Sequence, residues 1–99
     1  MKLKRVLQYA QDLLAEATHE GATVVDATAG NGHDTLFLAK LVGDNGQVYA
    51  FDVQKEAVDA TLLRLLDEGL EHRALVLKDG HENVAQYVTK PVSAAVFNL

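Results

Sequence analysis

The sequence lacks cysteine and long apolar runs, and it has no excess of positive charge. Without cysteine, neither a disulfide framework nor a thiolate metal site is expected. No apolar run reaches the roughly 18–20 residues that a membrane-spanning helix requires. The net charge of −5 argues against binding nucleic acid by bulk electrostatics. With 48% hydrophobic residues among 99, these features predict one soluble globular unit, expected in the cytoplasm.

The remaining polar residues add little by themselves. The four histidines have none of the spacings of metal ligands, so no metal site is predicted. Lys2, Lys4 and Arg5 form a small basic cluster at the N-terminus. This cluster fits either a solvated helix start or a phosphate contact.

Apolar periodicity and turn residues predict alternating helices and strands. Strands joined by helical crossovers pair in parallel, through right-handed connections with helices on both faces of the sheet. The predicted fold class is therefore α/β, with one parallel sheet. The expected helices are Leu3–Thr18, Thr35–Gly43, Lys55–Gly69 and Glu82–Val88, and the expected strands are Thr23–Thr28, Gln47–Val53, Arg73–Leu77 and Ser93–Leu99.

The segment VVDATAGNGHD, residues Val24–Asp34, carries the first functional signal. Ligands of parallel α/β sheets bind beyond the carboxyl ends of the strands, and here a strand that ends near Asp26 runs into a turn containing Gly30 and Gly32. Glycine permits a positive φ and lets a ligand approach the backbone without meeting a Cβ. Asp34 is expected to cap the next helix, whose free N–H groups point toward the loop. We therefore predict a ligand-binding loop.

The second signal ends the next expected strand. Asp52 lies 22 residues after Gly30, and an acid about 20 residues beyond a glycine loop is placed to accept hydrogen bonds from ribose hydroxyls. A dinucleotide site requires a third glycine where this chain has Thr35, and no Gly-Lys-Ser/Thr sequence follows to form a P-loop. The remaining prediction is a site for adenosine that carries an amino acid in place of a pyrophosphate.

The segments DATAGNGHDTLFLA, VYAFDVQ and AAVFNL resemble class I S-adenosylmethionine-dependent methyltransferases. Within that class they are similar to small bacterial proteins first described as rRNA methylases, a group associated with methylating the aminomethyl group on the wobble uridine of tRNA. The resemblance covers essentially all 99 residues, with Thr28 where the class has the first glycine of its loop. It implies a Rossmann-like sheet of order 3-2-1-4, and one partial domain, residues 1–99, of a seven-stranded fold.

The resemblance also implies which residues bind the cofactor, S-adenosyl-L-methionine. The loop after the first strand would hold the methionine part, with Asp34 near its ammonium group. Asp52 would bind the ribose, Gln54 would line its far side, and residues 79–81 would contact adenine. The implied cofactor-binding residues are Asp26, Thr28, Gly30, Asn31, Gly32, Asp34, Asp52, Gln54, Gly80 and His81.

Simpler roles stay open for several of these residues. Asp34 also fits a helix cap, Gln54 an exposed residue at a helix start, and residues 79–81 a turn. Asn98 is the catalytic residue that the resemblance implies, because its amide oxygen could accept hydrogen bonds from a substrate amine next to the methyl group. His33 is a weaker candidate for a general base, since methyl transfer to an amine depends mainly on proximity and orientation.

Three kinds of function remain open at this point. The leading prediction is a methyltransferase with an RNA substrate, expected to be tRNA. The alternatives are an NAD(P)-binding oxidoreductase domain, which Thr35 disfavours, and a non-catalytic cofactor-binding fragment. A fourth strand at the edge of the sheet would need to be covered, either by further strands or, in a homodimer, by a second copy of the chain.

Overall fold

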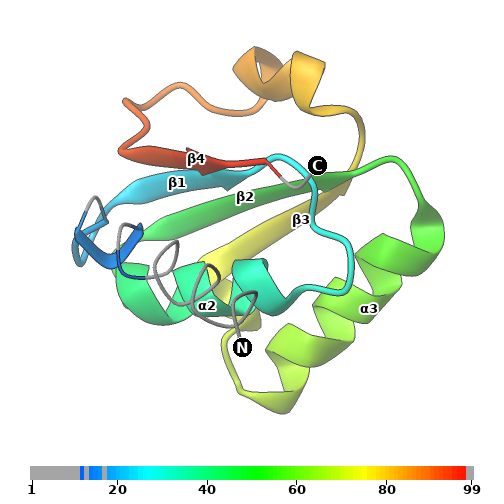
Figure 1. Ribbon diagram of the computed structural model, residues 1–99, viewed down its shortest axis with the longest axis horizontal. Coiled ribbons are helices and arrows are strands. Elements are labelled where there is room, and N and C mark those ends of the chain that lie inside the picture. Colours follow the sequence, from blue (N-terminus) through cyan, green and yellow to red (C-terminus); the bar gives the residue numbers. More distant parts are fainter. Residues whose placement is uncertain (1–11, 13, 17, 98–99) are drawn as a thin grey trace, which may run out of the picture.

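Four parallel strands form one sheet in this computed structural model, which describes residues 12, 14–16 and 18–97. Each neighbouring pair of strands is parallel, in the order β3-β2-β1-β4 (Figure 1). The α/β class and the strand order predicted above are thus confirmed. The strands are β1 (Thr23–Asp26), β2 (Gln47–Asp52), β3 (Ala74–Lys78) and β4 (Ala94–Val96).

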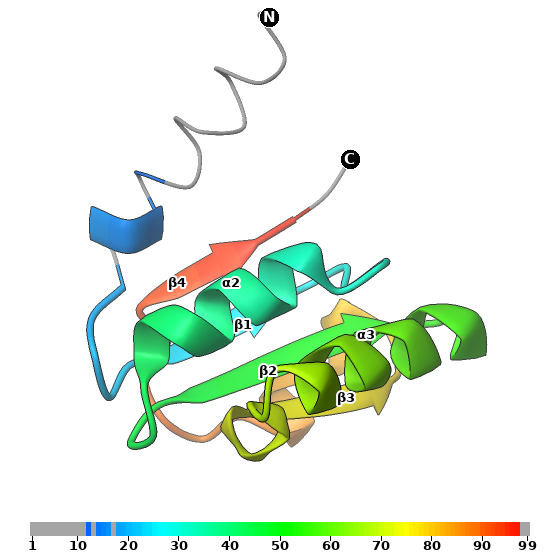
Figure 2. The same ribbon diagram turned by 90° about the horizontal axis from the view of Figure 1, so that it is seen from below.

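Two α-helices cover one face of this sheet. α2 (His33–Val42) joins β1 to β2, and α3 (Lys55–Asp67) joins β2 to β3. Both lie in front of the sheet in Figure 2, because two right-handed crossovers that step in the same direction place their helices on the same face. The connection from β3 to β4 steps back across β2 and β1, and its 3₁₀ helix η2 (His81–Gln86) lies on the other face (Figures 1 and 2).

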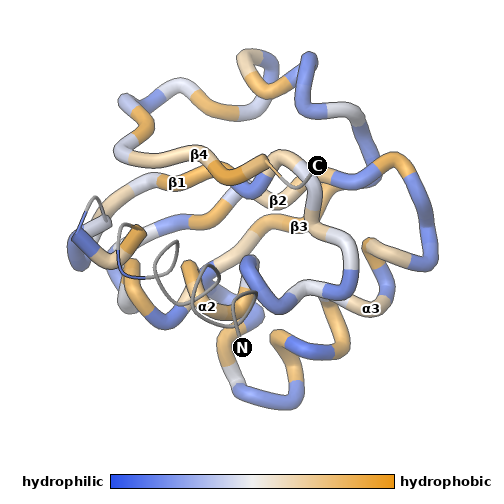
Figure 3. The backbone as a smooth tube through the Cα atoms, viewed as in Figure 1, coloured by the Kyte–Doolittle hydropathy of each residue, from blue (hydrophilic) through white to orange (hydrophobic). Residues whose placement is uncertain are grey.

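The main core lies between the helix pair and the sheet. Val24 of β1, Leu38 of α2 and Leu65 of α3 belong to one cluster and have no exposed surface. On the other face, the ring of Phe51 meets the ring of Tyr87 edge-on at 5.7 Å. In Figure 3, β1 and β4 carry mainly hydrophobic colours, whereas α3 alternates between hydrophobic and hydrophilic ones. This alternation is typical of a helix that buries only one face.

Two expected elements differ from those observed, and a third falls largely outside the described residues. The segment Glu82–Val88 is not an α-helix: its first five residues lie in η2, and the last two follow it. So short a segment gains little from helix propensity and follows its tertiary contacts. The fourth strand is limited to the three residues that pair with β1, Ala94–Val96. The helix expected over Leu3–Thr18 falls largely outside the described residues, of which 12 and 14–16 are helical.

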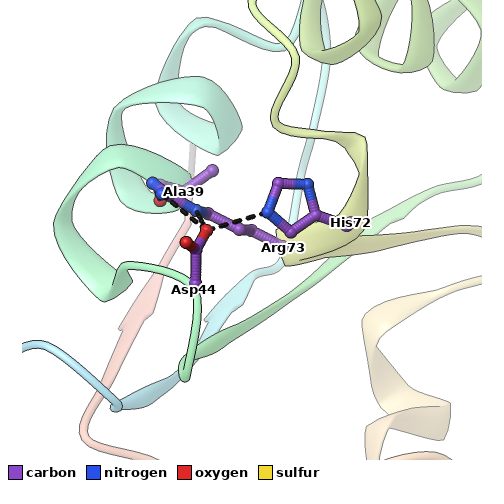
Figure 4. Close-up of polar contacts among 4 residues, drawn as sticks. All are labelled: Ala39, Asp44, His72 and Arg73. Atoms are coloured by element: carbon purple, nitrogen blue, oxygen red, sulfur yellow. Dashed lines mark hydrogen bonds and ion pairs between the residues drawn. The ribbon is translucent and has the colours of Figure 1, made fainter.

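A polar cluster fastens the turn after α2 to the chain before β3 (Figure 4). Arg73, the last residue of η1 (Glu71–Arg73), donates to Oδ1 of Asp44 from Nε at 2.9 Å and from Nη2 at 2.8 Å. Its Nη1 donates to the Ala39 carbonyl at 3.2 Å, which is among the last four of α2 and has no partner within the helix. Nε2 of His72 lies 2.9 Å from the same Asp44 oxygen. The cluster therefore supplies a hydrogen-bond donor to a free carbonyl at the carboxyl end of α2.

We expect Arg73→Met to lower the free energy of unfolding by about 1–2 kcal/mol, because it leaves the Ala39 carbonyl without its donor. Hydrogen bonds from His72 and Arg73 also hold the pKa of Asp44 below its ordinary value. The contribution of the Asp44 carboxylate to folding stability is therefore present at neutral pH, and it is lost as the pH falls through the folded pKa. Urea denaturation at neutral pH measures the change. The exposed Lys90→Met is the control, and equal midpoints for both variants would contradict this role.

Candidate functional site

The carboxyl ends of three neighbouring strands meet at one pocket. In the sheet register, Asp26 at the end of β1 pairs with Ala50, and Asp52 at the end of β2 pairs with Lys78. The chain that leaves each strand lines a cavity of about 220 Å3. Pockets that enclose a whole drug-sized ligand measure roughly 300–1,000 Å3, so this one suits part of such a ligand. Its lining residues are Ala27, Thr28, Asp52, Val53, Asp79, Gly80, His81 and Glu82.

Asp52, the acid marked by its spacing from the glycine loop, faces this pocket. Its Oδ2 accepts a hydrogen bond from the Gly30 N–H at 3.0 Å, and its Oδ1 accepts one from the Gln54 N–H at 2.9 Å. Each carboxylate oxygen has two lone pairs, so Asp52 retains acceptor sites for ligand hydroxyls. The binding of ribose by Asp52 stays a prediction. The side chain of Gln54 is exposed, and Val53 lines the pocket in its place.

The two loop glycines serve different purposes. Both have a positive φ, +55° at Gly30 and +87° at Gly32. No heavy atom lies within 4 Å of the place where a Cβ of Gly30 would be, so this backbone is open to approach. A Cβ of Gly32 would lie 2.8 Å from the Cα of Thr61 in α3. The open backbone expected at both positions is therefore present at Gly30, whereas Gly32 is buried and makes room for a helix.

Two residues of α3 hold the loop, although the sequence pattern marked neither as part of the site. Thr61 Oγ1 donates to the Gly30 carbonyl at 3.3 Å, and Arg64 Nε donates to the Asn31 carbonyl at 2.8 Å. Asn31 is itself exposed. Helical periodicity places residues three apart on one side of a helix, but it does not reveal which loop that side reaches.

Asp26 lies beneath the loop and has no exposed surface. Its Oδ2 accepts a hydrogen bond from the Thr35 hydroxyl at 2.7 Å, and its Oδ1 accepts one from the Thr28 N–H at 3.2 Å. Thr35, which stands where a dinucleotide-binding loop has its third glycine, is thus buried and anchors the carboxylate of Asp26. Asp26 orders the loop from within the protein, and its contact with the cofactor stays a prediction. Thr28 does line the pocket, and it does so without a positive φ.

The buried carboxyl group of Asp26 leads to a pH-dependent stability. Desolvation raises its pKa to about 6, against the bonds from Thr35 and Thr28 that lower it. The folded state therefore binds more protons than the unfolded state between the ordinary pKa of 3.8 and about 6, and stability falls as the pH rises through that window. We expect wild type to lose up to about 3 kcal/mol relative to Asp26→Asn. Urea unfolding of both proteins at about pH 4 and pH 7 measures this, and a pH-independent difference would refute it.

The start of α2 corrects the capping role predicted for Asp34. The helix begins at His33, its N-cap is Gly32, and no side chain caps it. Asp34 lies in the first turn, where a negative charge interacts favourably with the helix dipole. The capping prediction is wrong because the left-handed Gly32 starts the helix before Asp34 is reached. His33 is exposed on the helix instead of lying in the loop.

The turn after β3 forms the opposite wall of the pocket and is organised by Asp79. This carboxylate accepts hydrogen bonds from the Gly80 N–H at 2.8 Å, the Asn83 Nδ2 at 2.8 Å and the Tyr87 hydroxyl at 2.7 Å. The bonds from Asn83, Tyr87 and Gly80 hold the pKa of Asp79 below its ordinary value. Asp79 therefore remains an anion that ties its own turn together.

Gly80 and His81, the residues expected to contact adenine, both line the pocket. The His81 ring also meets the ring of Phe97, beyond β4, edge-on at 5.3 Å. Glu82 joins them in the lining, and the sequence pattern gave it no role. Adenine recognition by this wall stays a prediction.

The predicted catalytic residue, Asn98, lies outside the described residues, and its role stays a prediction. The carbonyl of Val96 in β4 accepts a hydrogen bond from the N–H of Ala27, a residue that lines the pocket, at 2.7 Å. The chain after β4 therefore starts beside the pocket. Within the described ranges, no group of three or more His, Asp or Glu side chains is placed to hold a metal ion. No helix in this part of the chain is long and apolar enough to cross a membrane.

Known proteins share this arrangement. The family described as "Putative rRNA methylase" matches residues 48–99. A solved structure from Clostridium thermocellum, described in the same words, is 48% identical with a TM-score of 0.92, over 94% of this chain and 50% of that chain. A protein from Streptococcus mutans described as a methyltransferase, in complex with S-adenosylhomocysteine, is 37% identical with a TM-score of 0.86, over 94% and 51%. The chloroplastic tRNA (mnm(5)s(2)U34)-methyltransferase of Arabidopsis thaliana is 40% identical over 72 residues, which is 68% of this chain and 26% of that protein.

A parallel sheet of order 3-2-1-4, with a glycine loop after its first strand and an acid ending its second, is the N-terminal half of a class I methyltransferase fold. The chain belongs to the family described as "Putative rRNA methylase", within the S-adenosylmethionine-dependent methyltransferases. It spans about half the length of the solved structures named above and about a quarter of the plant relative.

Proposed function

We propose that residues 1–99 form the cofactor-binding part of an S-adenosylmethionine-dependent methyltransferase that acts on RNA. The observation that carries this proposal is the hydrogen bond of 3.0 Å from the Gly30 N–H to Asp52 Oδ2, which joins the open glycine loop to the acid at the pocket. This pairing suits a nucleoside that carries an amino acid. The Streptococcus mutans relative, in complex with S-adenosylhomocysteine, supports the choice of ligand.

The donors and spaces of this site fit S-adenosylmethionine. Asp52 would accept hydrogen bonds from the ribose hydroxyls, the walls formed by Thr28 and residues 79–82 would hold adenine, and the methionine part would lie over Gly30. The bound cofactor supplies a methyl group on an electrophilic sulfonium. The chain itself binds and orients the cofactor. Thr61 and Arg64 hold the carbonyls of the glycine loop in place, so the loop is ordered before the cofactor binds.

The substrate we propose is the aminomethyl group on the wobble uridine of a tRNA, which the name of the plant relative specifies for that protein. Asn98 would accept a hydrogen bond from the amine and so direct the nitrogen lone pair toward the methyl group. An amine requires mainly proximity and in-line orientation, and its proton can pass to water. His33 therefore has no catalytic role in this proposal.

Calorimetry with S-adenosylhomocysteine tests the cofactor step. We expect saturable heat with one site per chain, and we expect that NAD does not displace S-adenosylhomocysteine. A loop that binds NAD requires a glycine at the position where this chain has Thr35, buried against Asp26. Methyl transfer to tRNA that carries the aminomethyl uridine, against the same tRNA without it, tests the substrate. Folded protein that gives no heat at about millimolar ligand would refute the proposal as a whole.

Location and assembly are also proposed. The cytoplasm is the expected location, as a compartment that holds both tRNA and S-adenosylmethionine. Among the described residues β4 pairs with β1 alone, and Val92 and Phe97 beside it are 43% and 58% exposed. A second copy or a further segment of chain would cover this edge.

A further inference from the structure

Asp26 is a buried acid with no positive charge beside it. Its side chain has no exposed surface, and no basic side chain among the described residues forms an ion pair with it. Its two hydrogen bonds come from neutral donors, the hydroxyl of Thr35 at 2.7 Å and the N–H of Thr28 at 3.2 Å. Buried charges are normally paired, so this carboxyl group lacks the partner that would favour its ionised form.

The charged groups that act on Asp26 are themselves acids. Asp34, in the first turn of α2, and Asp52, at the end of β2, both disfavour its negative charge. On the other side of β1, β4 (Ala94–Val96) has only apolar side chains. Arg64 of α3 reaches the loop, but it donates to a loop carbonyl and not to Asp26. Three acids therefore lie around one loop, and the innermost of them is shielded from water.

The carboxyl group of Asp26 lies directly behind the wall of the pocket. Ala27 and Thr28, the next two residues, both line the cavity, and the Thr28 N–H donates to Asp26. Gly30, over which the methionine part is proposed to lie, follows two residues later. A positive charge at that place would be separated from Asp26 by protein instead of water, so the attraction between the two charges would be screened only weakly.

We infer that Asp26 raises the affinity for S-adenosylmethionine relative to S-adenosylhomocysteine, by giving up its proton when the sulfonium binds. The inference rests on the proposed function, because it concerns the charge of the ligand in the same site. S-adenosylmethionine carries a positive charge on sulfur, whereas S-adenosylhomocysteine is the neutral sulfide that remains after the methyl group has passed to the substrate amine. The sulfonium stabilises the carboxylate, whose proton passes to the solvent. The product lacks this attraction, which favours its exchange for new cofactor.

The sign of the pH dependence follows from the ligand-free protein. Desolvation raises the pKa of Asp26 to about 6. Well above this value Asp26 is already ionised, and the sulfonium meets a full negative charge. Near pH 5 most of the ligand-free protein carries the proton, so part of the binding free energy goes into removing it. The advantage of the charged ligand is therefore present at neutral pH and is lost as the pH falls.

Calorimetry with the two ligands at about pH 5 and about pH 7 tests the inference. Two charges about 10 Å apart in protein interact strongly enough to change affinity about tenfold. For such an interaction we expect the affinity ratio of S-adenosylmethionine to S-adenosylhomocysteine to rise about fivefold between the two pH values in wild type. Titrations at about pH 5.5 in buffers of different ionisation enthalpy count the protons. About half a proton should leave with S-adenosylmethionine, and fewer with S-adenosylhomocysteine.

The variants assign the proton to Asp26. Asp26→Asn keeps the size of the side chain but does not titrate, so its affinity ratio should not change with pH. Asp67→Asn, at an exposed acid at the far end of α3, is the matched control and should behave as wild type. Thr35→Val removes the hydroxyl that donates to the ionised carboxylate, so the rise in the ratio should move to higher pH. Thr35→Ser keeps a hydroxyl and should restore it.

Thermal denaturation checks that each variant is folded. If wild type binds neither ligand, the proposed function fails. If wild type binds both ligands with a ratio that is independent of pH, the inference alone is overturned. It is also overturned if folded Asp26→Asn shows the same rise as wild type, or if folded Thr35→Val leaves the position of the rise unchanged.

Discussion

Asp52→Asn is expected to weaken the binding of S-adenosylhomocysteine by at least about a hundredfold. The variant keeps the size of the side chain, but its NH2 group cannot accept the hydrogen bond from one of the two backbone N–H groups, at Gly30 or Gln54, that Asp52 now holds. It also removes the charge from the acceptor proposed for the ribose. Hydrogen bonds to charged groups contribute about 1.5–3 kcal/mol, and about 1.4 kcal/mol is a factor of ten. The weakening of two such bonds gives the stated magnitude.

Calorimetry measures the effect, and thermal denaturation separates lost binding from lost folding. Asp67→Asn is the matched control, because Asp67 is an exposed acid at the far end of α3. We expect this control to bind as wild type does. A folded Asp52→Asn protein that binds within about threefold of wild type would rule out the role given to Asp52.

Gly32→Ala is expected to lower the free energy of unfolding by about 2–5 kcal/mol. The left-handed conformation costs a residue with a Cβ about 1–2 kcal/mol, and overpacking costs about 1–3 kcal/mol more. The clash is with the Cα of Thr61 at 2.8 Å, and a backbone atom cannot move aside as a side chain does. For a chain of this size such a loss is a large part of the total stability.

Gly30→Ala is the matched comparison, since it shares the positive φ but meets no heavy atom within 4 Å. We expect it to lose only about 1–2 kcal/mol of stability, yet to weaken binding of S-adenosylhomocysteine, because its Cβ enters the space proposed for the ligand. Urea denaturation and calorimetry on both variants measure this crossed pattern. Equal losses of stability at the two glycines would contradict it.

The fold was predictable because its signals are local. Short β-branched runs between glycines and the apolar period of α3 identify strands and a helix without reference to the rest of the chain. The prediction failed at Glu82–Val88, where a few turns of helix have no strong preference of their own. There Asn83 and Tyr87 converge on Asp79, a contact between residues whose arrangement no periodicity shows.

The site was predictable in part, through spacing. Gly30 and Asp52 are separated by one strand and one helix, and the chain geometry of such a unit brings them together wherever it occurs. The same spacing could not show that Asp26 is buried against Thr35. Nor could it show that Gly32, and not Asp34, starts α2.

The sequence by itself determined the order of the elements, the parallel sheet and the meeting of the glycine loop with Asp52. These follow from short-range propensity and from the handedness of the crossovers, which act through the backbone. Only the tertiary structure decided which glycine is open, which residues of α3 hold the loop, and that Glu82 faces the pocket. Those outcomes depend on side chains from separate elements that compete for the same space and the same hydrogen bonds, and this competition is resolved only when the elements pack together.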